Sequence, residues 1–305
     1  MLPVHEPAIG GQQASMRGFL RLSSCFRLDE VLVLQGTPLL GALFSMGRLT
    51  GARCLDLLVL AVASFCLVAH VFVLNDLCGA SADLRDPNRA TRVFMAGGIG
   101  RRQVGGLCAL LLALSLILIA PFGPTPLLIA LAIATLSALY SAPMFQMKGV
   151  PLISSVLHVL GGLLHFLLGY SLFGAIDGRS LAIGSFFALT FAAGHLTHEA
   201  RDYGSDLLNR IRTNAVAFGP GRSFAAGFLL FTAADVLLMV LAVRGVVPRV
   251  LVLVAGLYML HLWWALQTLR AGLTFENIRQ LQVRYRALYA IIGLLMVAGM
   301  IGAAR

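Results

Sequence analysis

The chain has 305 residues, of which 59% are hydrophobic and 12% charged, and its formal net charge is +10 at pH 7. A soluble domain of this length carries about a quarter of its residues as charges, so the composition excludes that class and indicates a membrane protein. The basic residues lie in short gaps between apolar segments rather than on one face, so we attribute them to membrane orientation and expect no nucleic-acid partner.

Residues 1–26 are polar, contain Arg17 and Arg21, and lack a long apolar stretch ending in small residues. They are therefore predicted to form a cytoplasmic tail rather than a signal peptide. Residues 27–305 are predicted to form a single transmembrane domain.

A helix needs roughly 20 apolar residues to cross a hydrocarbon core about 30 Å thick. Nine segments approach or exceed that length, and the turn Pro-Phe-Gly-Pro-Thr-Pro at 121–126 separates the third from the fourth. The segments are 29–47, 55–75, 104–121, 125–143, 150–174, 180–198, 222–243, 249–269 and 285–304. The sequence therefore predicts an all-α integral membrane protein, a bundle of about nine transmembrane helices.

Basic residues predict the orientation of this bundle. With the N-terminus inside, the tail, the cytoplasmic connections and the helix ends that adjoin them hold 17 of the 23 lysines and arginines. This bias predicts a cytoplasmic N-terminus and a C-terminus on the opposite side. A bacterial cytoplasmic membrane is the expected location, although organelle membranes would accept the same chain.

Acidic residues gather in two connections on the predicted cytoplasmic side, which together hold six of the 13. Residues four apart share a helix face, so Asp202 and Asp206 would point the same way if the sixth helix continues past the membrane surface. Asn75 and Asp83 likewise span two turns of one face. The six acidic residues are Asp76, Asp83, Asp86, Glu199, Asp202 and Asp206.

Two facing helix ends with pairs of oxygen ligands suit a diphosphate bridged by Mg²⁺, since Mg²⁺ prefers carboxylates together with substrate phosphates. Nearby Arg or Lys residues would neutralise the charge on the leaving diphosphate. A single Asp-x-x-x-Asp pair is most often a solvated surface feature. Two such clusters on one side, both interleaved with arginines, favour a binding site.

These residues resemble the UbiA-type intramembrane prenyltransferases, which have nine helices and two Asp-rich motifs. The first family motif, Asn-Asp-x-x-Asp-x-x-x-Asp, is similar to Asn75, Asp76 and Asp83, with Gly79 where the middle Asp is expected. Because that position normally supplies a metal ligand, Gly79 points to weaker binding of one Mg²⁺, to its replacement by Asp76 or Asp86, to altered chemistry or to an inactive member.

Three further elements carry the resemblance, and all run in family order. The second acidic motif is matched by Arg201, Asp202 and Asp206, and Glu199 supplies its upstream acid. The remaining two elements are Tyr140-Ser141-Ala-Pro143 with the trailing Lys148, and Arg92 with the turn Gly97-Gly98.

The resemblance implies transfer of a polyprenyl group from its allylic diphosphate to an acceptor, often an aromatic one, within the membrane. Asn75, Asp83, Asp202 and Asp206 would then hold Mg²⁺, with Asp76 in support. Asp202, Asp206 and Tyr140 would act at the reacting end. The implied contacts to the diphosphate are Arg92, Lys148 and Arg201.

Several histidines accompany these motifs. His158 and His165, seven apart on one helix face, could bind or deprotonate an acceptor, or could form hydrogen bonds between helices. His195 and His198 with Glu199 and Asp202 suggest zinc only weakly, because thiolates and a closed ligand set are missing.

Alternatives remain open at this stage. A terpene cyclase or a transferase with a sugar-phosphate acceptor would share the fold and the metal site. A transporter should contain two related halves with broken helices near the midplane, which the two unequal acidic connections disfavour. A non-catalytic membrane partner is compatible with Gly79.

Overall fold

The computed structural model describes residues 27–86, 88 and 90–303, and the predicted tail at 1–26 lies outside these residues. The described part is helical and contains no strand. Its principal helices are α2 (Leu28–Leu34), α3 (Gly36–Met46), α4 (Gly51–Asp83), α5 (Arg101–Ile119), α6 (Pro124–Ser141), α7 (Ile153–Tyr170), α8 (Gly178–Leu208), α9 (Asn214–Phe218), α10 (Pro220–Val243), α11 (Val254–Ala271) and α12 (Phe275–Ala303).

Eight helical segments in the described residues are long and apolar enough to cross a membrane. The first predicted segment is instead a shorter apolar stretch, Glu30–Met46, in which α2 gives way to α3 at Gln35. The expectation of an all-α bundle of about nine helices is confirmed. The chain is a multi-pass membrane protein.

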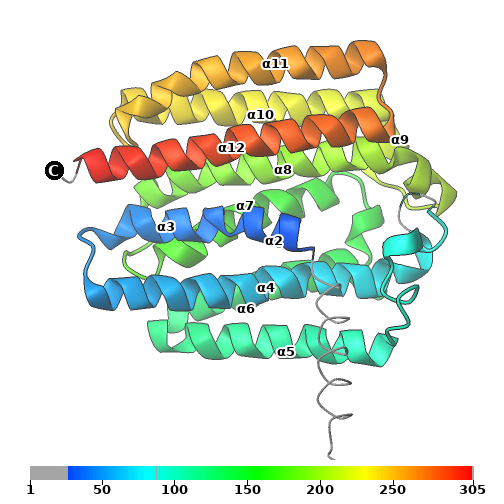
Figure 1. Ribbon diagram of the computed structural model, residues 1–305, viewed down its shortest axis with the longest axis horizontal. Helices are drawn as coiled ribbons and strands as arrows, with labels where there is room; N and C mark the ends of the chain where they lie inside the picture. Colours follow the sequence, from blue (N-terminus) through cyan, green and yellow to red (C-terminus); the bar gives the residue numbers. More distant parts are fainter. Residues whose placement is uncertain (1–26, 87, 89, 304–305) are drawn as a thin grey trace, which may run out of the picture.

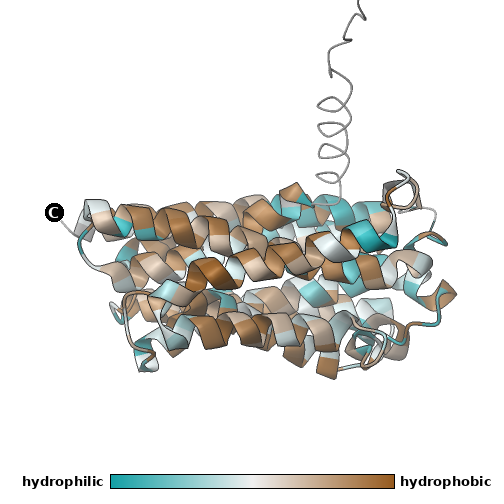
Figure 2. Cartoon of the chain, turned by 90° about the horizontal axis from the view of Figure 1, so that it is seen from below, coloured by the Kyte–Doolittle hydropathy of each residue, from teal (hydrophilic) through white to brown (hydrophobic). Residues whose placement is uncertain are grey.

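The long helices lie side by side as one bundle (Figure 1). Apolar residues cover their outer faces along most of their length, and polar residues gather toward the ends (Figure 2). Leu55, Ile117 and Leu229 are 62%, 66% and 67% exposed. Large apolar side chains remain on the outside because the surrounding solvent is hydrocarbon, while the helices satisfy their own backbone groups.

Glycines allow close approach at the centre of the bundle. A Cβ atom at Gly41 in α3 would clash with the carbonyl oxygen of Phe166 in α7, and one at Gly169 in α7 would clash with that of Pro38. A Cβ at Gly162 would lie 2.7 Å from the carbonyl oxygen of Phe187 in α8. These contacts hold α7 between α3 and α8, as small residues do in membrane bundles.

Several helices extend beyond the apolar segments that the sequence analysis identified. α4 continues to Asp83 and α8 to Leu208, so most of the acidic residues predicted to lie in connections are on helices. α12 begins at Phe275, ten residues before the predicted segment. Hydropathy identifies only the part of a helix within hydrocarbon, and a helix can continue into water where its residues and neighbours support it.

Candidate functional site

The ends of α4 and α8 that carry the two acidic motifs are adjacent, and both lie at the right-hand end of the bundle in Figure 1. Asn209, just after α8, donates a hydrogen bond from Nδ2 to the carbonyl oxygen of Ala82 at 3.2 Å. Ala82 precedes Asp83 of the first motif, and Asn209 follows Asp206 of the second by three residues. Two stretches separated by more than 100 residues of sequence therefore form one candidate site.

Asp76 of the first motif is directed to the segment before α2. The Arg27 guanidinium donates to both carboxylate oxygens of Asp76, with Nε at 3.1 Å from Oδ2. Arg27 also lies 3.5 Å from Glu30. Burial alone lowers the pKa of Arg27, but the carboxylates of Asp76 and Glu30 more than offset that effect and raise it above its ordinary value. This two-point contact fixes the start of α2 against the first motif.

Gly79 faces the carboxylate of Asp83. A Cβ atom built at Gly79 would lie 3.4 Å from Oδ2 of Asp83, which is an ordinary van der Waals contact. The two positions are one helical turn apart, so a side chain at 79 would join the same face of α4. The middle acid of the motif, if present, would therefore lie next to Asp83.

The second motif lies along one stripe of α8. His195, Glu199, Asp202 and Asp206 are spaced by four, three and four residues, which keeps them on one helix face. Asp206 is buried, and Lys148 and Asp202 are its principal charged neighbours. Lys148 follows the Tyr140 segment, so the structure brings that predicted element beside the second motif.

Arg201 interacts with its own neighbour in the motif. Its Nε and Nη2 donate to the two oxygens of Asp202 at 2.8 and 3.0 Å. Its Nη1 donates to Oε1 of Gln282 in α12 at 2.6 Å. Arg201 therefore orients the Asp202 carboxylate and ties α8 to α12, a role that the sequence did not suggest.

Glu199 is the centre of a buried hydrogen-bond network that fixes the segment after α8. Its Oε2 accepts from the backbone nitrogen and from Nδ2 of Asn214, each at 2.9 Å. Oδ1 of Asn214 accepts from the backbone nitrogen of Leu152 at 2.7 Å, and Ser154 donates to Oε1 of Glu199 at 3.4 Å. Sequence analysis missed Ser154 and Asn214, because only the tertiary structure brings them to Glu199.

Three aromatic side chains meet beside this network. The rings of His158 and His195 stack with centroids 3.7 Å apart and planes inclined by 8°. The rings of Tyr140 and His158 are nearly perpendicular, with centroids 5.0 Å apart. Nε2 of His195 lies 3.1 Å from Oε1 of Glu199. His158 lies only five residues after the start of α7, toward the end of the bundle that carries the acidic motifs.

The remaining residues that the sequence singled out lie in separate places. Asn75 lies half-buried on α4, one turn before Gly79. Arg92 ends a 3-10 turn, Ala90–Arg92, and its side chain lies outside what the structure describes. His198 lies 3.4 Å from Arg286, which in turn lies 3.5 Å from Glu30. His165 is buried in α7 with its Nδ1 2.7 Å from the carbonyl oxygen of Gly161.

No group of three or more His, Cys, Asp or Glu side chains in the described residues is arranged to hold a metal ion by itself. The acidic residues instead occur as pairs, such as Asp202 with Asp206. Mg²⁺ is commonly bound by one or two carboxylates plus substrate phosphates and water. The donor set therefore fits Mg²⁺ that arrives with a diphosphate and does not form a complete zinc site.

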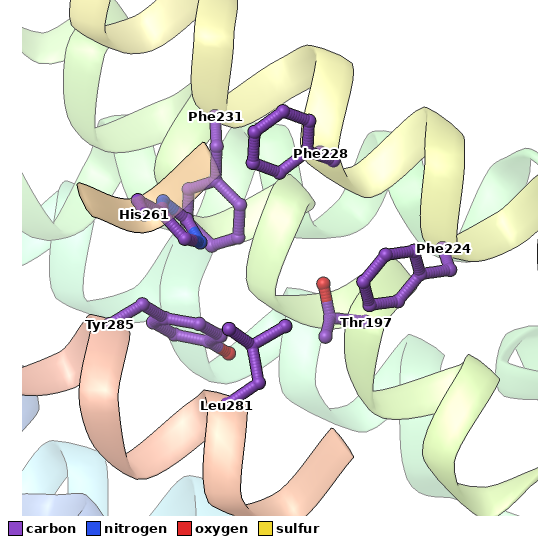
Figure 3. A pocket seen from close by; sticks show the side chains of 7 residues that line it. All are labelled: Thr197, Phe224, Phe228, Phe231, His261, Leu281 and Tyr285. Carbon is purple, nitrogen blue, oxygen red and sulfur yellow. The ribbon is translucent and has the colours of Figure 1, made fainter. Parts of the chain in front are cut away.

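A narrow pocket lies apart from this site, between α8, α10, α11 and α12 (Figure 3). It is too narrow to admit a water molecule and contains no acidic side chain. Thr197 contributes to it from a face of α8 other than that of His195 and Glu199, since two residues turn a helix by about 200°. Its lining residues are Thr197, Phe224, Phe228, Phe231, His261, Leu281 and Tyr285.

The chain is thus an all-helical membrane bundle in which two acidic helix ends meet near a lysine. The sequence matches the model of the UbiA prenyltransferase family over residues 36–274. Since this is most of the chain, the protein belongs to the UbiA prenyltransferase family. None of the curated proteins matches the sequence.

Solved structures have the same fold. The UbiA homolog from Archaeoglobus fulgidus bound to GPP and Mg²⁺ is 20% identical with a TM-score of 0.69, over 92% of this chain and 99% of that one. The apo UbiA homolog from Aeropyrum pernix K1 is 17% identical with a TM-score of 0.71, over 92% and 99%. A digeranylgeranylglyceryl phosphate synthase is 18% identical with a TM-score of 0.69, over 93% and 99%.

Proposed function

We propose that the protein catalyses Mg²⁺-dependent transfer of a prenyl group from an allylic polyprenyl diphosphate to an acceptor within the membrane. The observation that carries this proposal is the meeting of the two acidic motifs at one end of the bundle, with Lys148 beside Asp206. Membership of the UbiA prenyltransferase family supports it. So does the binding of GPP and Mg²⁺ by the homolog from Archaeoglobus fulgidus.

In this proposal Asn75 and Asp83 from α4 and Asp202 and Asp206 from α8 hold the metal. When bound, Mg²⁺ makes the diphosphate a better leaving group. Arg201 holds the Asp202 carboxylate in place through its paired hydrogen bonds. Asp76 supports the site indirectly, because its ion pair with Arg27 fixes α2 against α4.

The basic side chains and the helix walls have separate tasks. Lys148 neutralises charge on the departing diphosphate, and we assign the same task to Arg92. Tyr140 lies at the reacting end of the substrate. The apolar surfaces of the helices hold the isoprenoid tail and exclude water that would otherwise capture the allylic cation.

The proposal is tested by Mg²⁺-dependent binding of geranyl diphosphate to the purified full-length protein in lipid nanodiscs. Asp202→Ala combined with Asp206→Ala is expected to abolish binding. Glu276→Ala is the control, because Glu276 is an exposed acid at the start of α12 that pairs only with its helix neighbours in the described residues. Equal binding by the double variant, or no binding by the wild type, would refute the proposal.

A further inference from the structure

We propose that Nε2 of His158 is the base that removes a proton from the acceptor, and that the acceptor is a phenolic ring placed against Tyr140 and His158. This inference rests on the proposed function, because it assigns the step that follows ionisation of the diphosphate.

The first argument concerns the tautomer of His158. Its Nδ1 lies 2.8 Å from the carbonyl oxygen of Ser154. A carbonyl oxygen only accepts hydrogen bonds, so Nδ1 must carry the proton of the neutral ring. Nε2 is then the nitrogen with a free lone pair, as a general base requires.

The second argument concerns what holds the ring. His158 stacks on His195 at 3.7 Å, and His195 is itself fixed by Glu199 at 3.1 Å. Glu199 is held by Asn214. The plane of His158 is therefore set by a buried network that the metal site does not use.

The third argument is position. His195 and Asp202 share a face of α8 and are seven residues apart, which is about 10 Å along a helix. The imidazole stack therefore lies deeper in the membrane than the acidic pair, on the side toward which a prenyl chain extends from its diphosphate. His158 and Tyr140 are only half-buried, so part of their surface is open to a ligand.

The fourth argument concerns the chemical class of the acceptor. The ring centroids of Tyr140 and His158 are 5.0 Å apart and the ring planes are inclined by 82°, so the two rings form an aromatic corner. Aromatic rings pair well in edge-to-face or offset geometry, and a flat acceptor fits such a corner. A phenol also carries the protons that a base must remove.

The step balances as follows. The C–O bond of the allylic diphosphate breaks, and its electron pair leaves with pyrophosphate. A ring carbon of the phenol supplies the electron pair of the new bond to the prenyl cation. The proton on that ring carbon passes to Nε2 of His158, and the C–H electron pair restores the aromatic ring.

The test uses full-length protein in nanodiscs with geranyl diphosphate, Mg²⁺ and 1-naphthol as the phenolic probe. His158→Gln retains an N–H for the Ser154 carbonyl but has no base. It is expected to bind geranyl diphosphate as the wild type does and to form prenylated naphthol at least 100-fold more slowly. His70→Gln is the matched control, since Nδ1 of His70 also lies 2.9 Å from a carbonyl oxygen, that of Cys108, away from the site.

A second measurement separates a base from a packing residue. His158→Ala with added imidazole is expected to recover transfer in proportion to the imidazole concentration, because the free base replaces the deleted ring. For the supporting ring, His195→Phe keeps a flat partner and is expected to retain more transfer than His195→Ala.

The outcomes are separable. Transfer by His158→Gln within threefold of the wild type overturns the inference. So does wild-type protein that binds geranyl diphosphate but prenylates no naphthol. Failure of the wild type to bind geranyl diphosphate overturns the proposed function as well, and that result is measured independently of the acceptor.

Discussion

In the proposed metal site, Gly79 determines how many carboxylates the first motif offers to Mg²⁺. It lies one helical turn from Asp83, and the side chain it lacks would contact that carboxylate. Each added carboxylate strengthens the attraction for Mg²⁺, provided that the oxygen atoms reach the ion.

We therefore expect Gly79→Asp to lower the Mg²⁺ concentration needed for half-maximal binding of geranyl diphosphate by about threefold to tenfold, equivalent to about 0.7–1.4 kcal/mol. Isothermal titration at several Mg²⁺ concentrations measures this. Gly79→Ala is the control, because it adds the Cβ and the helix propensity without the charge. An Asp variant with the same Mg²⁺ requirement as the Ala variant would show that position 79 does not reach the metal.

Glu199 contributes to stability because it accepts hydrogen bonds from Asn214 and Ser154. Glu199→Gln keeps the size of the side chain but removes the charge. It also replaces one of the two accepting oxygens with an NH₂ group, which cannot accept from Asn214 at Oε2 or from Ser154 at Oε1. Because hydrogen bonds to buried charged groups contribute about 1.5–3 kcal/mol, we expect a clearly lower thermal unfolding midpoint in detergent.

The matched control for this change is Glu276→Gln, since Glu276 is an exposed acid that bonds only within α12 in the described part of the chain. Its unfolding midpoint should equal that of the wild type. Equal midpoints for both variants would mean that the Asn214 segment is held by other contacts.

Close packing is decided by which glycine faces a neighbouring helix. Gly162 in α7 faces α8, whereas a Cβ at Gly161 would meet nothing within 4 Å. The sequence analysis could not distinguish these adjacent residues, because both are small and both lie in an apolar helix.

We expect Gly169→Ala to destabilise the protein by about 1–3 kcal/mol or more, as overpacking typically does, because the new methyl group would force α7 away from α3. Gly161→Ala should be neutral or slightly stabilising, because alanine has the higher helix propensity. Thermal unfolding of the two variants side by side measures the difference. A reversed order would contradict the packing described here.

For the whole molecule, the positions of the helix ends allow the predicted membrane orientation to be tested by site-directed labelling. The acidic motifs and the connection after α8 lie at one end of the bundle, and the turn between α5 and α6 lies at the other (Figure 1). In a cysteine-free variant, Arg210→Cys should react with a membrane-impermeant maleimide only from the cytoplasmic side. Thr125→Cys should react only from the opposite side. Labelling in the reverse sense would refute the proposed N-terminus-in orientation.

The sequence by itself determined the class of fold. Lipid requires long apolar helices that satisfy their own backbone groups, so segment length and hydropathy were sufficient. The spacing of Asp202 and Asp206 was equally readable, because a helical period fixes which residues share a face. The extension of α4 and α8 beyond the apolar core was not readable from hydropathy, since polar helical turns resemble loops.

Only the tertiary structure decided what each motif residue contacts. Arg201 pairs with Asp202, and Asp76 pairs with Arg27 from 49 residues away. The stack of His158 on His195 joins α7 to α8, and the sequence of neither helix predicts that these two rings meet. Local sequence specifies the period and polarity of each helix, but the partner of a side chain depends on how the helices pack, because packing is set by the shapes of all the side chains together.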